Sequence, residues 1–168
     1  MQEPQLSNFW DRLKTVKDFT LHVHSGSKSE TRWNGRGKVS VLVSEDATTI
    51  TFLERGSWQG ERNANIAFSN TVRWIFDRSV GMISLEHLRF GPRNPVFLFH
   101  LIPTEIHRLA SMESHLCKED EYLAQVAWDW HSIRLSYRVI GPKKNEEIEY
   151  FYIIDEKGVC HVADRTNE

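Results

Sequence analysis

Apolar residues recur at every second position along most of this chain, with polar residues between them, which is the period of a half-buried β-strand. Between residues 30 and 43 one face carries Trp33, Gly35, Gly37, Val39, Val41 and Val43. The alternation returns after each group of turn-forming residues, such as Ser44–Ala47 and Gly91–Pro95. No strand–helix–strand rhythm accompanies it. The pattern therefore predicts an antiparallel sheet with hairpin connections rather than a doubly wound parallel sheet.

The expected strands number about ten, which is typical of an antiparallel barrel or sandwich. They cover residues 19–23, 30–43, 50–58, 64–68, 72–76, 82–90, 96–102, 122–130, 133–139 and 148–154. Residues 104–112 fit a helix or a strand, and their place between two strands favours a strand. Gly35 and Gly37 within one long strand favour a sharply bent sheet, and hence an up-and-down barrel. A barrel of this size has an interior wide enough for packed side chains or one small ligand.

A short helix is expected before the first strand. Ser7 is suited to cap a helix from Asn8 to about Val16, in which Phe9 and Leu13 recur at helical spacing. We expect this helix to plug or flank the sheet. The 168 residues are the size of one domain. Residues 1–6 and 163–168 are predicted to be flexible tails.

Charge and composition limit the class of protein. A formal net charge of −2 lacks the basic surface that general nucleic-acid binding requires. No apolar run is long enough to span a bilayer, and the N-terminus lacks the order of a secretory signal. Two cysteines, Cys117 and Cys160, do not make a disulfide framework. We therefore expect a cytoplasmic protein, and both a monomer and a homodimer are open.

A dense cluster of polar and reactive side chains lies in the last third of the chain, at His115, Cys117, Asp120 and Tyr122. One interpretation is a ligand-facing or catalytic cluster at the mouth of a barrel, with Asp120 fixing a histidine tautomer. The other is a tight turn from Cys117 to Glu121, held by bonds from Asp120 to backbone amides.

This cluster, followed by Trp128, Trp130 and the run Val139–Lys144, resembles a family catalogued as the domain of unknown function 6314. Looser similarity extends over nearly the whole chain, at Arg36–Gly37, Leu53–Gly56 and Phe99–His100. The family usually continues its Gly-Pro-Lys run with an Asp, where this chain has Lys144–Asn145. The resemblance implies a lipocalin-like, calycin-type barrel. It implies no reaction, because the family has no established activity.

An aromatic barrel interior suits a small, partly apolar ligand. The residues expected to line it are Trp33, Phe52, Trp74, Phe99, Tyr122, Trp128 and Tyr137, with His100, His115 and Arg138 as polar contacts. Arg134 and Arg138 share one strand face. They are suited either to hold an anionic ligand inside the barrel or to pair with Glu147 and Glu149 on its outside. The main expectation is a small-molecule binding protein without a resident cofactor.

Three other functions stay open. An enzyme would use His115, Cys117, Asp120 and Tyr122 as acid, base or nucleophile. A haem-binding barrel would use His100, which has apolar neighbours, as the axial ligand. A filled barrel would serve as an interaction protein. No metal is expected, because the candidate ligands lack the usual zinc spacings. Those candidates are His100, His115, Cys117, Cys160 and His161.

Overall fold

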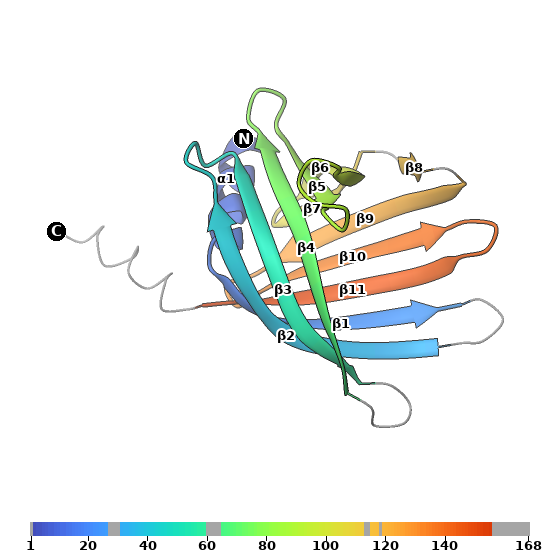
Figure 1. The fold of residues 1–168 in the computed structure, drawn as a ribbon. Helices are drawn as coiled ribbons and strands as arrows, with labels where there is room; N and C mark the ends of the chain where they lie inside the picture. The colour runs from blue at the N-terminus through green and yellow to red at the C-terminus, as the bar shows by residue number, and fades with distance from the viewer. Residues whose placement is uncertain (1, 27–30, 60–64, 113–114, 118, 156–168) are drawn as a thin grey trace.

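The computed structural model describes residues 2–26, 31–59, 65–112, 115–117 and 119–155. The chain begins with one helix, α1 (Gln2–Leu13), and continues in eleven strands (Figure 1). The strands are β1 (Val16–Ser25), β2 (Thr31–Val43), β3 (Thr49–Gln59), β4 (Asn65–Asp77), β5 (Met82–His87), β6 (Val96–Glu105), β7 (Arg108–Ser111), β8 (His115–Cys117), β9 (Asp120–Trp128), β10 (Ser132–Ile140) and β11 (Asn145–Ile154). None of the helical residues described forms a helix long and apolar enough to cross a bilayer.

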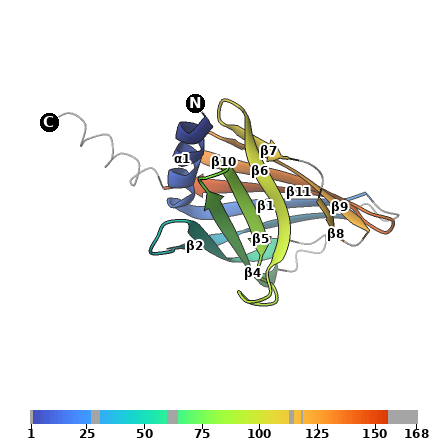
Figure 2. The same cartoon turned by 90° about the horizontal axis from the view of Figure 1, so that it is seen from above.

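The strands form one antiparallel sheet that closes on itself. From β1 to β7 each strand pairs with the next one along the chain. β9 then pairs with both β7 and β10, and β10 and β11 lead back to β1. The short β8 pairs with the first residues of β9. The expected antiparallel, lipocalin-like barrel with a short N-terminal helix is confirmed (Figures 1 and 2).

The strand limits differ from the predicted ones in several places, since β5 ends at His87 rather than at residue 90 and β9 spans Asp120–Trp128 rather than 122–130. The largest difference is in β4. The strands predicted at 64–68 and 72–76 belong to one continuous strand, β4. The polar pair Ser69–Asn70 resembles a turn in the sequence, but it pairs in register with Arg55 and Glu54 of β3. The Asn70 side chain binds Glu54 inside the barrel, so these polar residues do not interrupt the sheet. The ambiguous segment 104–112 contains a strand, β7.

β2 and β3 approach each other closely where Gly37 lies opposite Gly56. A Cβ atom at Gly37 would lie 2.1 Å from the carbonyl oxygen of Arg55, and one at Gly56 would lie 2.3 Å from that of Arg36. Both contacts are with backbone atoms, which do not turn aside as the end of a side chain does. Both positions therefore require glycine. Figure 1 shows that both strands curve strongly around the barrel.

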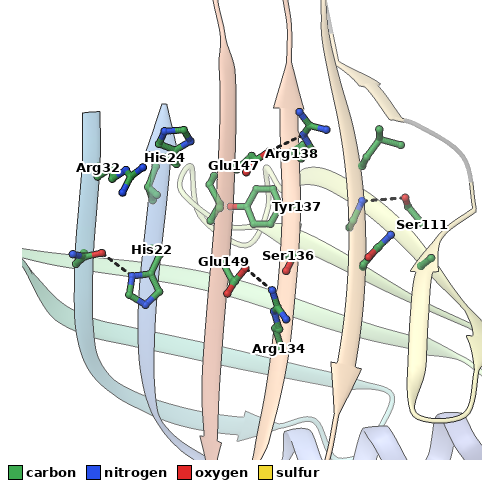
Figure 3. A pocket seen from close by; sticks show the side chains of 17 residues that line it. His22, His24, Arg32, Ser111, Arg134, Ser136, Tyr137, Arg138, Glu147 and Glu149 are labelled. Atoms are coloured by element: carbon green, nitrogen blue, oxygen red, sulfur yellow. Dashed lines mark hydrogen bonds and ion pairs between the residues drawn. The ribbon is translucent and has the colours of Figure 1, made fainter. Parts of the chain in front are cut away.

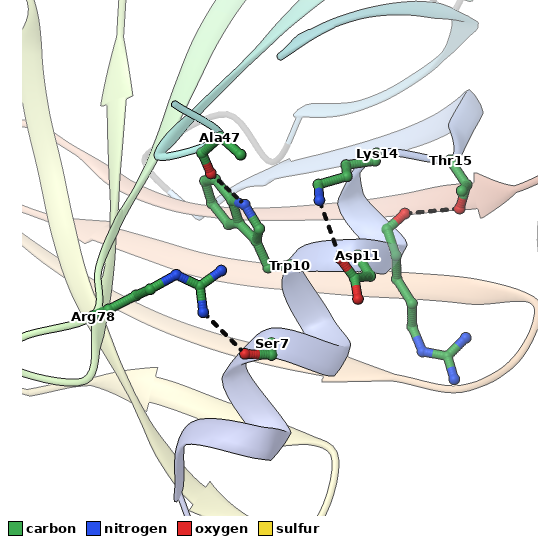
Figure 4. A network of polar contacts seen from close by, with 8 residues as sticks. Ser7, Trp10, Asp11, Lys14, Thr15, Ala47 and Arg78 are labelled. Atoms are coloured by element: carbon green, nitrogen blue, oxygen red, sulfur yellow. Dashed lines mark hydrogen bonds and ion pairs between the residues drawn. The ribbon is translucent and has the colours of Figure 1, made fainter. Parts of the chain in front are cut away.

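The helix α1 closes one end of the barrel. Its fully buried side chains are Leu6, Phe9, Trp10 and Leu13. The Phe9 ring lies 5.9 Å from the Trp74 ring and 5.0 Å from the Trp128 ring. The Trp10 indole N–H donates to the carbonyl oxygen of Ala47 at 2.9 Å (Figure 4). The helix is thus a plug, which is one of the two positions expected for it.

The predicted start of the helix is wrong. α1 begins at Gln2 rather than Asn8, and Pro4 lies in the first turn, where its missing N–H has no partner to lose. Ser7 lies inside the helix, where its hydroxyl accepts a hydrogen bond from Arg78 Nη1 at 3.2 Å (Figure 4). Residues 2–6 are therefore part of the plug and not a tail. The tail predicted at 163–168 lies outside the described residues.

We expect Gly37→Ala to destabilise the protein by about 3 kcal/mol, the upper end of the range for overpacked sites, because the new methyl group meets backbone. Gly35→Ala is the matched control two residues away. Its Cβ atom would lie 3.2 Å and 3.3 Å from ring atoms of Trp58 and Phe68, which are side chains and can shift. Urea unfolding of both variants measures the difference. Equal losses of stability would show that the close approach of β2 and β3 does not constrain the barrel.

Trp128 and Trp130 provide a second comparison, because they lie two residues apart with opposite environments. Trp128 is 5% exposed beneath α1, whereas Trp130 is 65% exposed. The Arg12 guanidinium lies over the Trp130 ring, 4.6 Å from its centroid. We expect Trp128→Ala to lower the free energy of unfolding by about 3–5 kcal/mol. Trp130→Ala should lower it by about 1 kcal/mol or less. Thermal and urea unfolding check both values, and a small loss at Trp128 would contradict the plug.

Candidate functional site

The two ends of the barrel interior differ. The α1 end is filled by fully buried side chains, including Phe9 and Trp74. At the opposite end the inward-facing apolar side chains are only half-buried, and we call these seven residues the mouth. They are Val23, Trp33, Trp58, Phe68, Leu98, Tyr137 and Ile148. The Trp58 ring lies 4.8 Å from the Phe68 ring and 6.3 Å from the Trp33 ring, so aromatic surface dominates this end.

A polar network lies deeper in the barrel, around Glu54 of β3. The Glu54 side chain is fully buried. Its Oε1 atom accepts hydrogen bonds from Asn70 Nδ2 at 3.1 Å and from the Tyr150 hydroxyl at 3.2 Å. Its Oε2 atom accepts one from the Tyr152 hydroxyl at 2.7 Å. The two tyrosine rings stack, with centroids 5.1 Å apart.

His87, the last residue of β5, continues this network towards solvent. It is half-buried, and its Nε2 atom is hydrogen-bonded to Asn70 Oδ1. Because an amide oxygen only accepts, His87 Nε2 is the donor in this bond. A continuous chain of hydrogen bonds thus joins a half-buried imidazole to a fully buried carboxyl group. We call Glu54, Asn70, His87, Tyr150 and Tyr152 the Glu54 network.

Burial controls the electrostatics of the network. It raises the pKa of Glu54, although the bonds from Tyr152, Asn70 and Tyr150 oppose that shift. Burial also raises the pKa values of both tyrosines. It lowers the pKa of His87, and the nearby Arg89 adds to this effect. Among the described residues no lysine or arginine forms an ion pair with Glu54. The carboxyl group is therefore held by neutral donors alone.

The sequence predictions did not include the Glu54 network. Glu54 occupies the inward phase of β3, two and four residues after Phe52 and Ile50, which are both fully buried. An acidic residue in the apolar phase of a strand is the signal that could have indicated it. Asn70 is likewise a polar residue in the inward phase of a strand, β4, but in the sequence alone, without its partner Glu54, it resembles a turn residue.

A separate pocket of about 910 Å³ lies over β1, β2, β7, β9, β10 and β11 (Figure 3). Its polar lining residues include His22, Asn34, Ser136, Arg138 and Glu149. These positions alternate with Val23, Tyr137 and Ile148, whose side chains pack against the core. The polar side chains therefore project from the outer face of the sheet, and the pocket is a groove on the outside of the barrel.

Ion pairs occupy this outer groove. Arg134 Nη2 lies 2.9 Å from Glu149 Oε2, and Arg138 Nε lies 3.2 Å from Glu147 Oε1 (Figure 3). Of the two roles considered for these arginines, the structure shows the pairing on the outside. The prediction that Arg138 contacts a ligand inside the barrel is wrong, because its place in β10 turns its side chain outward.

The other predicted lining residues fall into three groups. Trp33, Tyr122 and Tyr137 belong to inward-facing phases near the open end, whereas Trp74 and Trp128 are core residues beneath α1. Phe52 and Phe99 are also fully buried core residues. His100 is exposed on the outer face of β6, where its Nδ1 atom is hydrogen-bonded to the Ser84 hydroxyl at 2.7 Å. It is therefore not placed to bind haem within the barrel.

Comparison with known proteins identifies the family. The model of a family of unknown function, DUF6314, matches residues 10–153. This chain belongs to that family. Among solved structures, the S-type phycobiliprotein lyase CPES from Guillardia theta is similar over 90% of this chain and 93% of the lyase, with a TM-score of 0.59 and 10% identity. A search of curated proteins finds no match.

Two parts of the DUF6314 resemblance lie at the open end of the barrel, the hairpin that contains Cys117 and Asp120 and the run Val139–Lys144, whereas Trp128 lies beneath α1. In the β8–β9 hairpin His115 lies opposite Tyr122, Leu116 opposite Glu121 and Cys117 opposite Asp120. Glu121 is therefore part of the strand rather than of the turn, and bonds from Asp120 to backbone amides stay a prediction. Asp120 also contacts the next hairpin, because a Cβ atom at Gly141 would lie 2.0 Å from its Oδ1 atom. The DUF6314 cluster thus joins two neighbouring hairpins.

Parts of the predicted cluster are not described. The side chains of His115 and Cys117 lie outside the described part of the structure, as do Cys160 and His161. A catalytic role for His115, Cys117, Asp120 and Tyr122 stays a prediction. Within the described part of the chain, no three His, Cys, Asp or Glu side chains are grouped as metal ligands would be.

The raised pKa of Glu54 predicts a distinctive pH dependence for Glu54→Gln. Below its ordinary pKa of 4.5 the group is protonated in both the folded and unfolded states. Above that pH the unfolded state ionises first, so the wild type loses stability as pH rises through the folded pKa, and the glutamine variant does not. We expect the stability of the variant relative to wild type to increase with pH, by at most about 1.4 kcal/mol per pH unit.

Urea unfolding between about pH 4.5 and pH 8 measures this difference. Glu147→Gln is the control, because it removes a carboxyl group from the exposed outer face. Because Glu147 takes part in an exposed ion pair with Arg138, its removal should change the stability by about 1 kcal/mol or less. A difference between Glu54→Gln and wild type that stays constant with pH would contradict the raised pKa.

Proposed function

We propose that this DUF6314 protein is a binding barrel, which admits a small, partly apolar ligand through the mouth and holds the polar end of that ligand at the Glu54 network. The observation that carries the proposal is the full burial of the Glu54 carboxyl group. A buried polar network of this kind is often less stabilising than apolar side chains of similar volume. The fold does not need an acid here, since Ile50 and Phe52 fill the same face of β3 with apolar groups. Recognition of a ligand accounts for its presence.

The half-buried mouth supports the same proposal. A filled barrel would cover its aromatic rings at both ends, as α1 does over Trp74. At the mouth Trp33, Trp58 and Phe68 instead keep part of their surface exposed. Ligand sites combine such aromatic walls with a few convergent polar groups. Here the convergent groups are Glu54 and the two tyrosines that donate to it.

The solved structure of similar fold is described as a phycobiliprotein lyase. At 10% identity the likeness shows the fold alone. It supports a lipocalin-like barrel as the scaffold, while the case for a ligand depends on the mouth and on Glu54. A cytoplasmic location and a homodimer stay predictions.

Native mass spectrometry of the purified protein is the first test, because a small molecule that co-purifies would give the ligand class directly. The second test is titration with 2-naphthalenemethanol, a neutral aromatic probe, followed by tryptophan fluorescence and calorimetry. We expect saturable binding that Trp33→Ala weakens about three- to tenfold, since one aromatic contact contributes about 0.5–1.5 kcal/mol.

Trp130→Ala is the control for the fluorescence titration, because this tryptophan is exposed beside the plugged end. Its removal should leave the affinity for the probe unchanged. A bare mass together with no saturable binding of the probe would contradict the proposed function. Equal effects at Trp33 and Trp130 would place the probe elsewhere than in the mouth.

A further inference from the structure

We infer that the ligand of this barrel is a protonated amine or a nitrogen heterocycle with an N–H donor, whose nitrogen binds Glu54, and not a carboxylate or a phosphate. This inference rests on the proposed function and names the chemical class of its ligand. It reverses the charge of the anionic ligand that the arginines of β10 would have held.

The distribution of charge through the barrel wall is the first observation. Of the charged residues that the structure describes, two are buried, Glu54 and Arg12. Arg12 belongs to α1 and lies over the ring of Trp130 at the plugged end. Arg134 and Arg138 pair with glutamates on the outer face. As the structure describes them, the mouth and the Glu54 network contain one ionisable acid and no arginine or lysine. An anionic ligand would therefore find no arginine or lysine to hold it there, and it would meet like charge wherever Glu54 is ionised.

The hydrogen bonds of Glu54 are the second observation. A carboxylate offers about four lone-pair sites. Asn70 and Tyr150 donate to Oε1, and Tyr152 donates to Oε2. One acceptor site is left on Oε2, and a ligand with an N–H donor is suited to it. Once Glu54 is ionised it has no hydrogen to donate, so a ligand group that only accepts hydrogen bonds, such as a carboxylate, cannot bond to it.

The aromatic walls are the third observation. Cations are attracted to the faces of aromatic rings, most strongly to tryptophan, and the attraction increases where water is excluded. Trp33, Trp58 and Phe68 present such rings on the way to Glu54. The walls and the buried acid thus favour the same ligand charge.

Binding of a cation should also change the protonation of the network. The groups that contact or face Glu54 are Tyr150 and Tyr152 of β11, Tyr137 of β10, Asn70 of β4 and, through Asn70, His87 of β5. Burial keeps Glu54 protonated above its ordinary range, and an ammonium group beside it favours the carboxylate. Binding should therefore release a proton from Glu54. The affinity for a cation should rise with pH until the amine itself loses its proton.

The test uses three probes that share one ring system and differ in charge: 2-naphthylmethylammonium, 2-naphthalenemethanol and 2-naphthoate. We expect the ammonium to bind about tenfold or more tightly than the alcohol, and the naphthoate to bind more weakly than either. Between about pH 5 and pH 8 the affinity for the ammonium should rise while that for the alcohol stays constant. Calorimetry in two buffers with different ionisation enthalpies should show proton release with the ammonium alone.

Glu54→Gln is the decisive variant, because it keeps the volume and removes the charge. We expect it to abolish the preference for the ammonium over the alcohol, and with it the rise of the ammonium affinity with pH. Glu147→Gln makes the same change on the outer face and should keep the preference.

The outcomes separate the two proposals. If the alcohol binds and the ammonium binds no more tightly, the inference about charge is wrong and the binding barrel stands. If the preference for the ammonium survives in Glu54→Gln, the cation binds elsewhere and the inference is wrong as well. If no probe binds, the proposed function fails. Should Glu54→Gln not fold, the pH dependence and proton release of the wild-type protein decide, and their absence would overturn the inference.

Discussion

The close approach of β2 and β3 at Gly37 and Gly56 is the constraint on which the barrel depends. The carbonyl group of Arg55 occupies the space that a Cβ atom would need at Gly37, and that of Arg36 occupies the space needed at Gly56. On one side of this close approach β2 and β3 carry inward residues of the plugged end, and on the other side they carry residues of the mouth. The two glycines therefore lie between the two ends of one interior. Glu54 lies two residues from Gly56 on β3, and its position in the interior follows from the strand period that it shares with the buried Ile50 and Phe52.

A buried acid within this interior has consequences for the neighbouring strands. Its two oxygens need donors, and Asn70, Tyr150 and Tyr152 supply them from β4 and β11, which lie far apart in the sequence. The requirement explains why β4 passes through polar residues without a break. A polar pair that resembles a turn in the sequence is stable in mid-strand because one member finds a buried acceptor.

Alternation alone predicted much of the fold. The strand period placed Phe52, Phe99 and Trp128 inside the barrel and indicated antiparallel hairpins. Helical spacing indicated the apolar face of the helix. The strand period also predicts that the His100 side chain points outward, because His100 lies between the buried residues Phe99 and Leu101. Its apolar sequence neighbours suggested an interior ligand, although in a strand those neighbours point to the opposite face.

The candidate site was harder to predict because its members are close only after the sheet closes. Glu54 and Tyr150 are 96 residues apart in sequence, and no short motif links them. The one local signal was an acid in an apolar strand phase. For Arg134 and Arg138 the sequence offered both faces of the wall, and only the register of β10 against β11 places Glu149 and Glu147 within reach of them on the outside.

The wall of the barrel therefore separates two kinds of charge. On its outer face acids and bases on neighbouring strands neutralise each other, and solvent screens what remains. On its inner face a single carboxyl group is satisfied by neutral hydroxyl and amide donors, in a region where an uncompensated charge is far more costly. Burial raises the pKa of that carboxyl group, so it stays protonated above its ordinary range until a cation beside it stabilises the carboxylate. The interior at Glu54 is therefore the place where the barrel favours a partner of positive charge.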